Sequence, residues 1–157
     1  TPFTRQSLVS RILTEQNITG MQAGFGRMSA DFWPCLKDRK GRVTRSISSR
    51  YPESSWNQCN IRMMPYFSPG PNGARSTTRY EMIVEGMQEC EARIYIEKVL
   101  LDKAQRAKLG AERAKRIQDL LDLRTRVLIW GTYPAGWQDR SAKLYAAAAE
   151  VAKALGR

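Results

Sequence analysis

Residues 66–91 read YFSPGPNGARSTTRYEMIVEGMQECE, and this stretch decides how the fold is interpreted. It starts with a turn rich in proline and glycine, in which the Asn-Gly pair at 72–73 favours a tight reversal. Ser76 or Thr77 can then cap a helix, and Glu81 in the first turn suits the helix dipole. The stretch therefore predicts a turn that leads directly into a helix beginning near Thr77.

The chain before this stretch has the helix–turn–strand order of a parallel α/β protein. Residues 4–16 predict a helix, because apolar side chains recur there at helical spacing, and Asn17 suits the end of that helix. Residues 21–25 then alternate in a way that predicts a short strand, with small residues suited to a crowded barrel interior. This order indicates the α/β fold class.

The rest of the chain divides into a long connection and a helical half. Residues 34–76 hold five prolines and three glycines and are predicted to be loop-like, and a connection of this length is more often functional than neutral. After residue 77, periodic apolar residues predict packed helices, with a pause near Gly110 and a turn at 130–137. A last helix is expected to open at Asp139 or Ser141.

Three segments of the sequence together resemble one enzyme family. Residues 66–91 run from a Pro-Gly-Pro-Asn-Gly turn into a helix that contains Glu-Gly-Met-Gln-Glu-Cys-Glu. Residues 24–34, GFGRMSADFWP, look like a late barrel strand, and residues 50–57, RYPESSWN, look like the loop that follows it. This order is similar to the C-terminal part of the catalytic domain in glycoside hydrolase family 123 and its uncharacterised relatives, over roughly residues 5–101.

The resemblance implies a fold and a division into domains. Residues 1–101 would be the C-terminal portion of a (β/α) barrel of the catalytic type, and residues 102–157 a helical extension. A complete barrel typically needs about 250 residues, so the 157-residue chain would be a fragment of one. We therefore expect an α/β protein that consists of a C-terminal barrel fragment followed by helices.

The resemblance also implies a wall of a sugar pocket. Family members deliver a tryptophan from the late strand to the sugar, which here is Trp33, and an indole ring can stack on a pyranose face. Asp31 and Arg27 would bond sugar hydroxyls, or form a salt bridge with each other. Tyr66 and Trp56 would line the same pocket. The structural alternative for Trp33 is that it fills the top of the barrel core.

No catalytic residue is expected in this chain. Family members are understood to use an adjacent Asp-Glu pair, with assistance from the N-acetyl group of the substrate, and no Asp-Glu dipeptide occurs in the sequence. We interpret the chain as a segment of a carbohydrate-active protein that contributes pocket wall and barrel closure, with the acid/base pair absent or upstream. Near the helix start, the expected structural anchors are Arg79, Glu81 and Glu85.

Histidine is absent from the sequence, which excludes Ser-His-Asp and Cys-His chemistry within this chain. Its absence also removes a usual ligand of zinc. Cys35, Cys59 and Cys90 are widely spaced and form no CxxC pair, so we expect buried free thiols. No metal and no cofactor is predicted.

The charge suggests an alternative function. Lysine and arginine number 26 against 15 aspartate and glutamate, a net charge of +11. Two basic groups, residues 37–50 and 103–116, supply much of this excess. A spread of this kind is usually a solvated surface, so nucleic acid is an unlikely partner, but a small basic nucleic-acid-binding protein is the alternative. A helical interaction module over residues 77–157 is a third hypothesis.

The expected partners follow from the leading interpretation. They are a carbohydrate substrate and either the missing N-terminal portion of the barrel or a second copy, because a partial barrel leaves strand edges and an apolar helix face uncovered. No membrane association is expected, since no apolar run approaches the roughly 20 residues that span a bilayer. The sequence carries no targeting signal that would fix the localisation.

Overall fold

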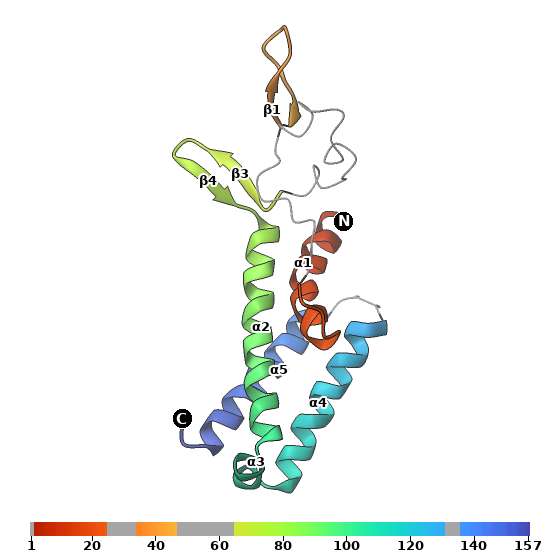
Figure 1. Cartoon of the computed structure of the whole chain (residues 1–157), viewed down its shortest axis with the longest axis vertical. Helices are drawn as coiled ribbons and strands as arrows, with labels where there is room; N and C mark the ends of the chain where they lie inside the picture. The colour runs from red at the N-terminus through yellow and green to blue at the C-terminus, as the bar shows by residue number, and fades with distance from the viewer. Residues whose placement is uncertain (1, 25–33, 47–64, 131–135) are drawn as a thin grey trace.

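A computed structural model describes residues 2–24, 34–46, 65–130 and 136–157. In this part of the chain, a bundle of helices carries two small β-hairpins at one end (Figure 1). The helices are α1 (Pro2–Thr19), α2 (Thr78–Leu101), α3 (Lys103–Leu109), α4 (Ala111–Trp130) and α5 (Trp137–Ala154). The strands are β1 (Pro34–Lys37), β2 (Val43–Ser46), β3 (Phe67–Gly70) and β4 (Gly73–Ser76).

The predicted α/β barrel fragment is wrong. Each sheet among the described residues has two strands that are neighbours in sequence and run antiparallel, β1 with β2 and β3 with β4. A barrel of this class needs parallel strands joined by crossover helices. The expected strand after α1 is also missing from residues 20–24, where Met21 has a φ of 52° and is 94% exposed. A positive φ breaks an extended run, so the alternation there does not form a strand.

Part of the connection predicted to be loop-like is β-hairpin. In the second hairpin, Phe67 pairs with Ser76 and Gly70 pairs with Gly73, so the predicted turn falls at the hairpin tip. Gly73 has a φ of 124°, a conformation that glycine adopts without steric cost. In the first hairpin the register shifts between Pro34 and Lys37, which makes this ribbon irregular.

Helix α2 begins where the sequence predicts. Thr77 is the N-cap, and its side chain accepts a hydrogen bond from the backbone N–H of Tyr80. The same hydroxyl donates to the carbonyl of Tyr66 at 2.8 Å, so one side chain closes the hairpin base and starts the helix. At the other end, Asp102 terminates α2 and caps α3, accepting from the backbone N–H groups of Ala104 and Gln105, each at 2.9 Å.

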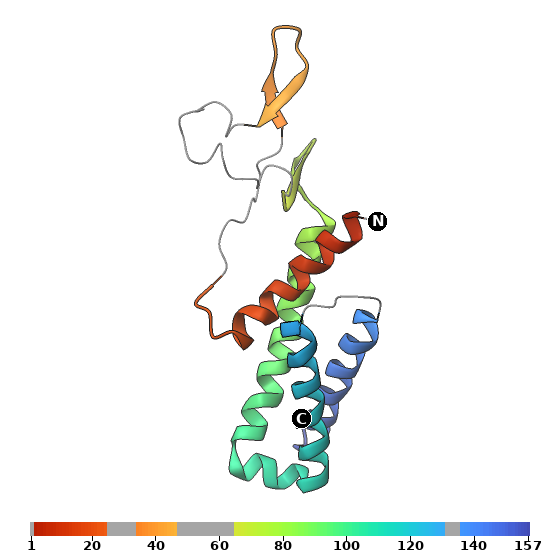
Figure 2. The same cartoon turned by 90° about the vertical axis from the view of Figure 1, so that its right-hand side faces the viewer.

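The hydrophobic core surrounds the C-terminal half of α2, where α3, α4 and α5 pack against it (Figure 2). The buried residues of this core come from both sides of residue 101, the predicted boundary between a barrel portion and a helical extension. One core therefore joins the two predicted regions. Within the described ranges, none of the helices combines the length and the apolar character needed to cross a bilayer. The buried core residues are Ile96, Val99, Leu100, Leu109, Ala114, Ile117, Leu121, Leu144, Ala147 and Val151.

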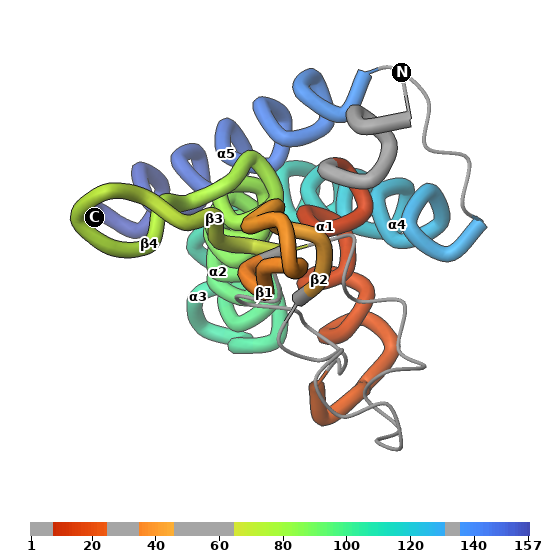
Figure 3. Tube along the Cα trace, turned by 90° about the horizontal axis from the view of Figure 1, so that it is seen from above, coloured from red at the N-terminus to blue at the C-terminus, as the bar shows by residue number. Residues whose placement is uncertain are grey.

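Helix α1 packs against the N-terminal half of α2, although 58 residues separate the two helices in sequence. Seen along the long axis, α1, α3 and α5 all lie next to α2 (Figure 3). Gly86 makes the close approach of α1 possible, because a Cβ at this position would collide with the Arg11 carbonyl and the Thr14 hydroxyl. The glycine that interrupts the α2 pattern therefore marks the crossing point of two helices.

Candidate functional site

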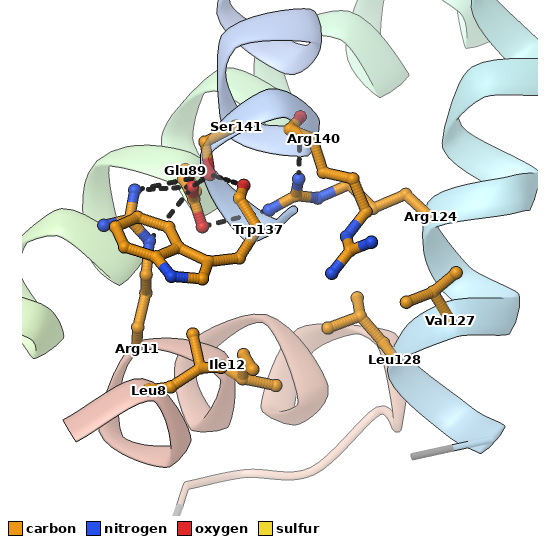
Figure 4. Close-up of a pocket in the computed structure, with 10 residues that line it drawn as sticks. All are labelled: Leu8, Arg11, Ile12, Glu89, Arg124, Val127, Leu128, Trp137, Arg140 and Ser141. Carbon is orange, nitrogen blue, oxygen red and sulfur yellow. Dashed lines mark hydrogen bonds and ion pairs between the residues drawn. The ribbon is translucent and has the colours of Figure 1, made fainter. Parts of the chain in front are cut away.

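A cluster of buried charges lies where α1, α2, α4 and α5 meet (Figure 4). Two carboxylates are at its centre: Glu15 is 1% exposed and Glu89 is 3% exposed. Isolated buried carboxylates would be strongly disfavoured, so each needs charged partners. Three buried arginines supply them, and we call this set the ionic core: Arg11, Glu15, Glu89, Arg93 and Arg124.

Arg124 links the two carboxylates. Its Nη2 lies 2.7 Å from Glu15 Oε2 and 3.0 Å from Glu89 Oε2, and its Nε donates to both oxygens of Glu15 at 2.8 and 2.9 Å. Burial opposes the charge on this guanidinium, but the hydrogen bonds and charges of Glu15 and Glu89 outweigh it and raise the pKa of Arg124. Arg124 therefore joins α4 to α1 and α2 as a permanent cation.

The other two arginines bind the same carboxylates from different sides. Arg11 donates to Glu89 Oε1 from Nε at 3.2 Å and from Nη2 at 2.7 Å, and it also pairs with Glu85. Its guanidinium lies 4.4 Å from the ring centroid of Trp137, a cation–π contact with α5. Arg93 donates to Glu15 at 3.0 Å.

Polar neighbours complete the ionic core. Ser141 on α5 donates its hydroxyl to Glu89, and Thr125 on α4 accepts from Arg93 at 2.7 Å. Burial raises the pKa of the adjacent Cys90 thiol, so Cys90 is a poor nucleophile at neutral pH. With its charges paired, the ionic core holds four helices together.

One cavity beside the ionic core, lined by Arg11, Glu89 and Arg124 among others, is small. Its volume is about 30 Å³, and apolar side chains of α1 and α4 form much of its wall (Figure 4), whereas an open hollow on the Arg93 side of the core, lined by Ile18, Thr19, Arg93, Glu97 and Thr125, measures about 220 Å³. The smaller of these two spaces admits one or two water molecules and excludes a sugar ring. Among the residues that the structure describes, no group of three or more carboxylate and thiol side chains is arranged to hold a metal ion. The lining residues of the small cavity are Leu8, Arg11, Ile12, Glu89, Arg124, Val127, Leu128, Trp137, Arg140 and Ser141.

A second charged feature is the turn of the β1–β2 hairpin, which stands away from the helices (Figures 1 and 2). Asp38 organises this turn by accepting from the backbone N–H groups of Lys40 at 2.8 Å and Arg42 at 2.9 Å. These bonds lower the pKa of the Asp38 carboxyl, and the bond from the Arg42 backbone N–H is the largest cause. The basic side chains around it are exposed.

Most of the residues predicted to contact sugar lie outside the described residues, namely Arg27, Asp31, Trp33 and Trp56. Tyr66 is described and is half-buried beside β3, with its carbonyl bonded to Thr77. Because only Tyr66 of these five residues is described, their sugar-binding role stays a prediction.

The predicted anchors occupy three different environments at the start of α2. Arg79 is half-buried in the first turn, and Glu81 is exposed there, next to the positive end of the helix dipole. Glu85 pairs with Arg11 on α1, so its partner is another helix. Of the thiols predicted to be buried, Cys90 is buried but Cys35 is exposed, and Cys59 lies outside the described residues.

The ionic core was missed from the sequence, although the sequence contains a signal for it. Arg124 falls on the same helical stripe as Ile117, Leu121 and Leu128, which are buried. A charged residue at a core position of the helical repeat needs a buried partner of opposite charge. Which residue provides that partner depends on helix packing, because Glu15 is 109 residues away in sequence.

Comparisons of this chain with protein-family models, with curated protein sequences and with solved structures gave no match.

Proposed function

We propose that this chain is a non-catalytic, carbohydrate-binding segment of a glycoside-hydrolase-like protein. The proposal keeps the sugar-pocket role expected from the sequence and drops the barrel. In place of barrel closure, the ionic core and the hydrophobic core give the segment its rigidity. Sugars related to N-acetylhexosamine are the expected ligands, because the resembled family uses the N-acetyl group of its substrate.

The observation that carries the proposal is the ordered structure of residues 66–91, the stretch on which the resemblance rests. Its turn forms the tip of the β3–β4 hairpin, and Thr77 caps α2. Its Glu-Gly pair at 85–86 contacts α1, and Glu89 enters the ionic core. A defined structural position for each part supports reading the stretch as one structural motif, within a fold that is not the barrel of the resembled family.

The alternative of a nucleic-acid-binding protein has weaker support. The described residues of the two basic groups lie at opposite ends of the molecule, one set on the β1–β2 hairpin and the other around α3 and the start of α4 (Figure 1). Members of the second group are partly neutralised, since Arg113 and Arg116 pair with Glu150 and Lys115 pairs with Asp119. A nucleic-acid footprint is expected to be a continuous basic surface.

A binding experiment with matched tryptophan variants tests the proposal. Isothermal titration calorimetry of the chain with chitohexaose should detect binding. In a separate activity assay, an aryl N-acetyl-β-hexosaminide should not be hydrolysed. Trp33→Ala should weaken binding about tenfold or more, because it removes the stacking ring. Trp130→Ala is the control, since this tryptophan ends α4 and is 81% exposed.

Two results would count against the proposal. One is the absence of glycan binding by the folded chain, with folding verified by circular dichroism. The other is an equal loss of affinity in the Trp33 and Trp130 variants. Trp33→Phe provides a second check, because it keeps an aromatic face and should retain most of the affinity.

A further inference from the structure

The turn of the β1–β2 hairpin concentrates positive charge on a small exposed surface. Residues 37–45 contain five basic residues and one acidic residue, a net charge of +4. We call these five basic residues the basic tip, and all five are exposed. Figure 1 shows the hairpin standing clear of the helices. The basic tip consists of Lys37, Arg39, Lys40, Arg42 and Arg45.

The only acid in the turn acts on the backbone. Asp38 accepts from the N–H groups of Lys40 and Arg42 and from the Arg42 Nε at 2.9 Å, which closes the turn. Gly41 takes a φ of 77°, as the reversal requires. Within the described part of the chain, Lys37, Arg39 and Arg45 form no ion pair. The turn is thus fixed in shape, while Lys37, Arg39 and Arg45 stay available to a ligand.

We propose that the basic tip binds the anionic groups of an acidic polysaccharide, that is, carboxylates or sulfates on its sugar units. This inference rests on the proposed carbohydrate function and names the class of glycan. Guanidinium groups bind carboxylate and similar oxyanions through paired hydrogen bonds, and short clusters of lysine and arginine are typical of sites for polyanions, acidic glycans and nucleic acids alike. The hairpin also begins at Pro34, directly after Trp33, the residue predicted to stack on the sugar.

The size of the basic tip favours a glycan over duplex DNA. A DNA duplex carries one charge per about 1.7 Å, and single DNA-binding modules bury about 600–1,000 Å² of protein surface. A turn of nine residues is small for that contact. Residues 34–46 also contain no aromatic side chain on which unpaired bases could stack. Two or three anionic groups on neighbouring sugars match the basic tip better.

The test compares three hexasaccharides that share N-acetylhexosamine but differ in charge. Chitohexaose is neutral, a hyaluronan hexasaccharide carries carboxylates, and a chondroitin sulfate hexasaccharide carries carboxylates and sulfates. At low salt, both acidic glycans should bind at least about tenfold more tightly than chitohexaose, and this gain should shrink as salt is added. An equal gain for the two acidic glycans assigns the carboxylate as the recognised group, and a larger gain for the sulfated one assigns the sulfate.

A pair of double variants locates the effect. Arg39→Gln with Lys40→Gln should weaken binding of the acidic glycans about tenfold and leave chitohexaose binding unchanged. The control, Arg106→Gln with Lys108→Gln, removes the same charge from exposed positions on α3 at the other end of the molecule. It should leave the affinity for all three glycans unchanged. Equal weakening by both pairs would overturn the proposal, because attraction would then depend on net charge alone.

Asp38→Ala separates a shaped site from a simple accumulation of charge. It removes the one negative charge of the turn, and it also removes the acceptor of the Lys40 and Arg42 backbone N–H groups that closes the turn, so the affinity for acidic glycans should stay the same or fall. A rise in affinity would contradict the role of the fixed turn. Tighter binding of a 20-base-pair DNA duplex than of either acidic glycan would replace the proposal by the nucleic-acid alternative.

The outcomes separate this inference from the proposed function. Binding of chitohexaose that depends on Trp33, with no gain for the acidic glycans, would overturn the inference alone. Acidic glycans that bind through the basic tip, with no dependence on Trp33, would overturn the predicted sugar pocket and leave the anionic site in place.

Discussion

Replacement of Glu89 by glutamine tests whether the ionic core holds the helices together. The carboxylate is 3% exposed and lies between the guanidinium groups of Arg11 and Arg124. Glutamine has nearly the same shape and keeps one oxygen as an acceptor, so the variant removes charge with little change in packing. Arg11 would then keep only the partly exposed Glu85, and Arg124 would share Glu15 with Arg93.

The expected loss is large relative to the stability of a single domain. Breaking a buried ion pair by removing one partner costs about 3–5 kcal/mol, against a typical total of about 5–15 kcal/mol. For a chain of this length, each kcal/mol lowers the melting temperature by about 2–4 °C, so Glu89→Gln should lower it by about 6–20 °C. The assay is thermal and urea unfolding followed by circular dichroism.

A matched variant on the same helix controls for the glutamate-to-glutamine change itself. Glu91 lies two residues further along α2 and is exposed, so Glu91→Gln should change the free energy of unfolding by no more than about 0.5 kcal/mol. A loss below about 1 kcal/mol for Glu89→Gln, or equal losses for the two variants, would refute the reasoning. A double-mutant cycle with Arg124→Gln should give a coupling free energy on the order of 1–3 kcal/mol.

Four further predictions follow from the contacts described above. Gly86→Ala should lower the free energy of unfolding by about 1–3 kcal/mol, because the added Cβ would collide with the Arg11 carbonyl, and this cost exceeds the higher helix propensity of alanine. Urea unfolding measures the change, and unchanged stability would argue against the close crossing of α1 and α2. Thr77→Ala should cost about 1 kcal/mol by removing the cap of α2, whereas Thr77→Ser should cost less. The pKa of Asp38 is lowered, so the contribution of its carboxylate to the stability of the turn is fully present above the ordinary value of 3.8 and is lost as the pH falls through the lower folded value. The NMR amide shifts of Lys40 and Arg42 should therefore titrate with a midpoint below 3.8, and a higher midpoint would contradict the closed turn. In the folded chain Cys35, which is exposed, should react with a thiol reagent quickly and Cys90 only after unfolding, as mass spectrometry of the labelled peptides can show.

The local signals in the sequence were sufficient for the helices but not for their assembly. Apolar spacing located α1 and the start of α2, and Thr77 was identified as a candidate cap, because helix periodicity and capping depend on residues within a few positions of each other. The strand expected at residues 21–25 failed because short alternation does not fix a strand without a partner to pair with. In the described residues the strands pair within hairpins, which removes the basis for a barrel.

The sequence by itself determined the helical character of the second half, the capped turn–helix junction, the net charge of +11, and the absence of histidine chemistry and of an Asp-Glu pair. These properties depend on composition and on short-range order. Only the tertiary structure decided that α1 packs on α2 at Gly86 and that Glu15 and Glu89 share Arg124. The physical reason is that a buried charge is tolerated only beside a partner of opposite charge. Arg124 and its two carboxylate partners are 35 and 109 residues apart in sequence, so helix packing brings them together and no local pattern identifies the pairs.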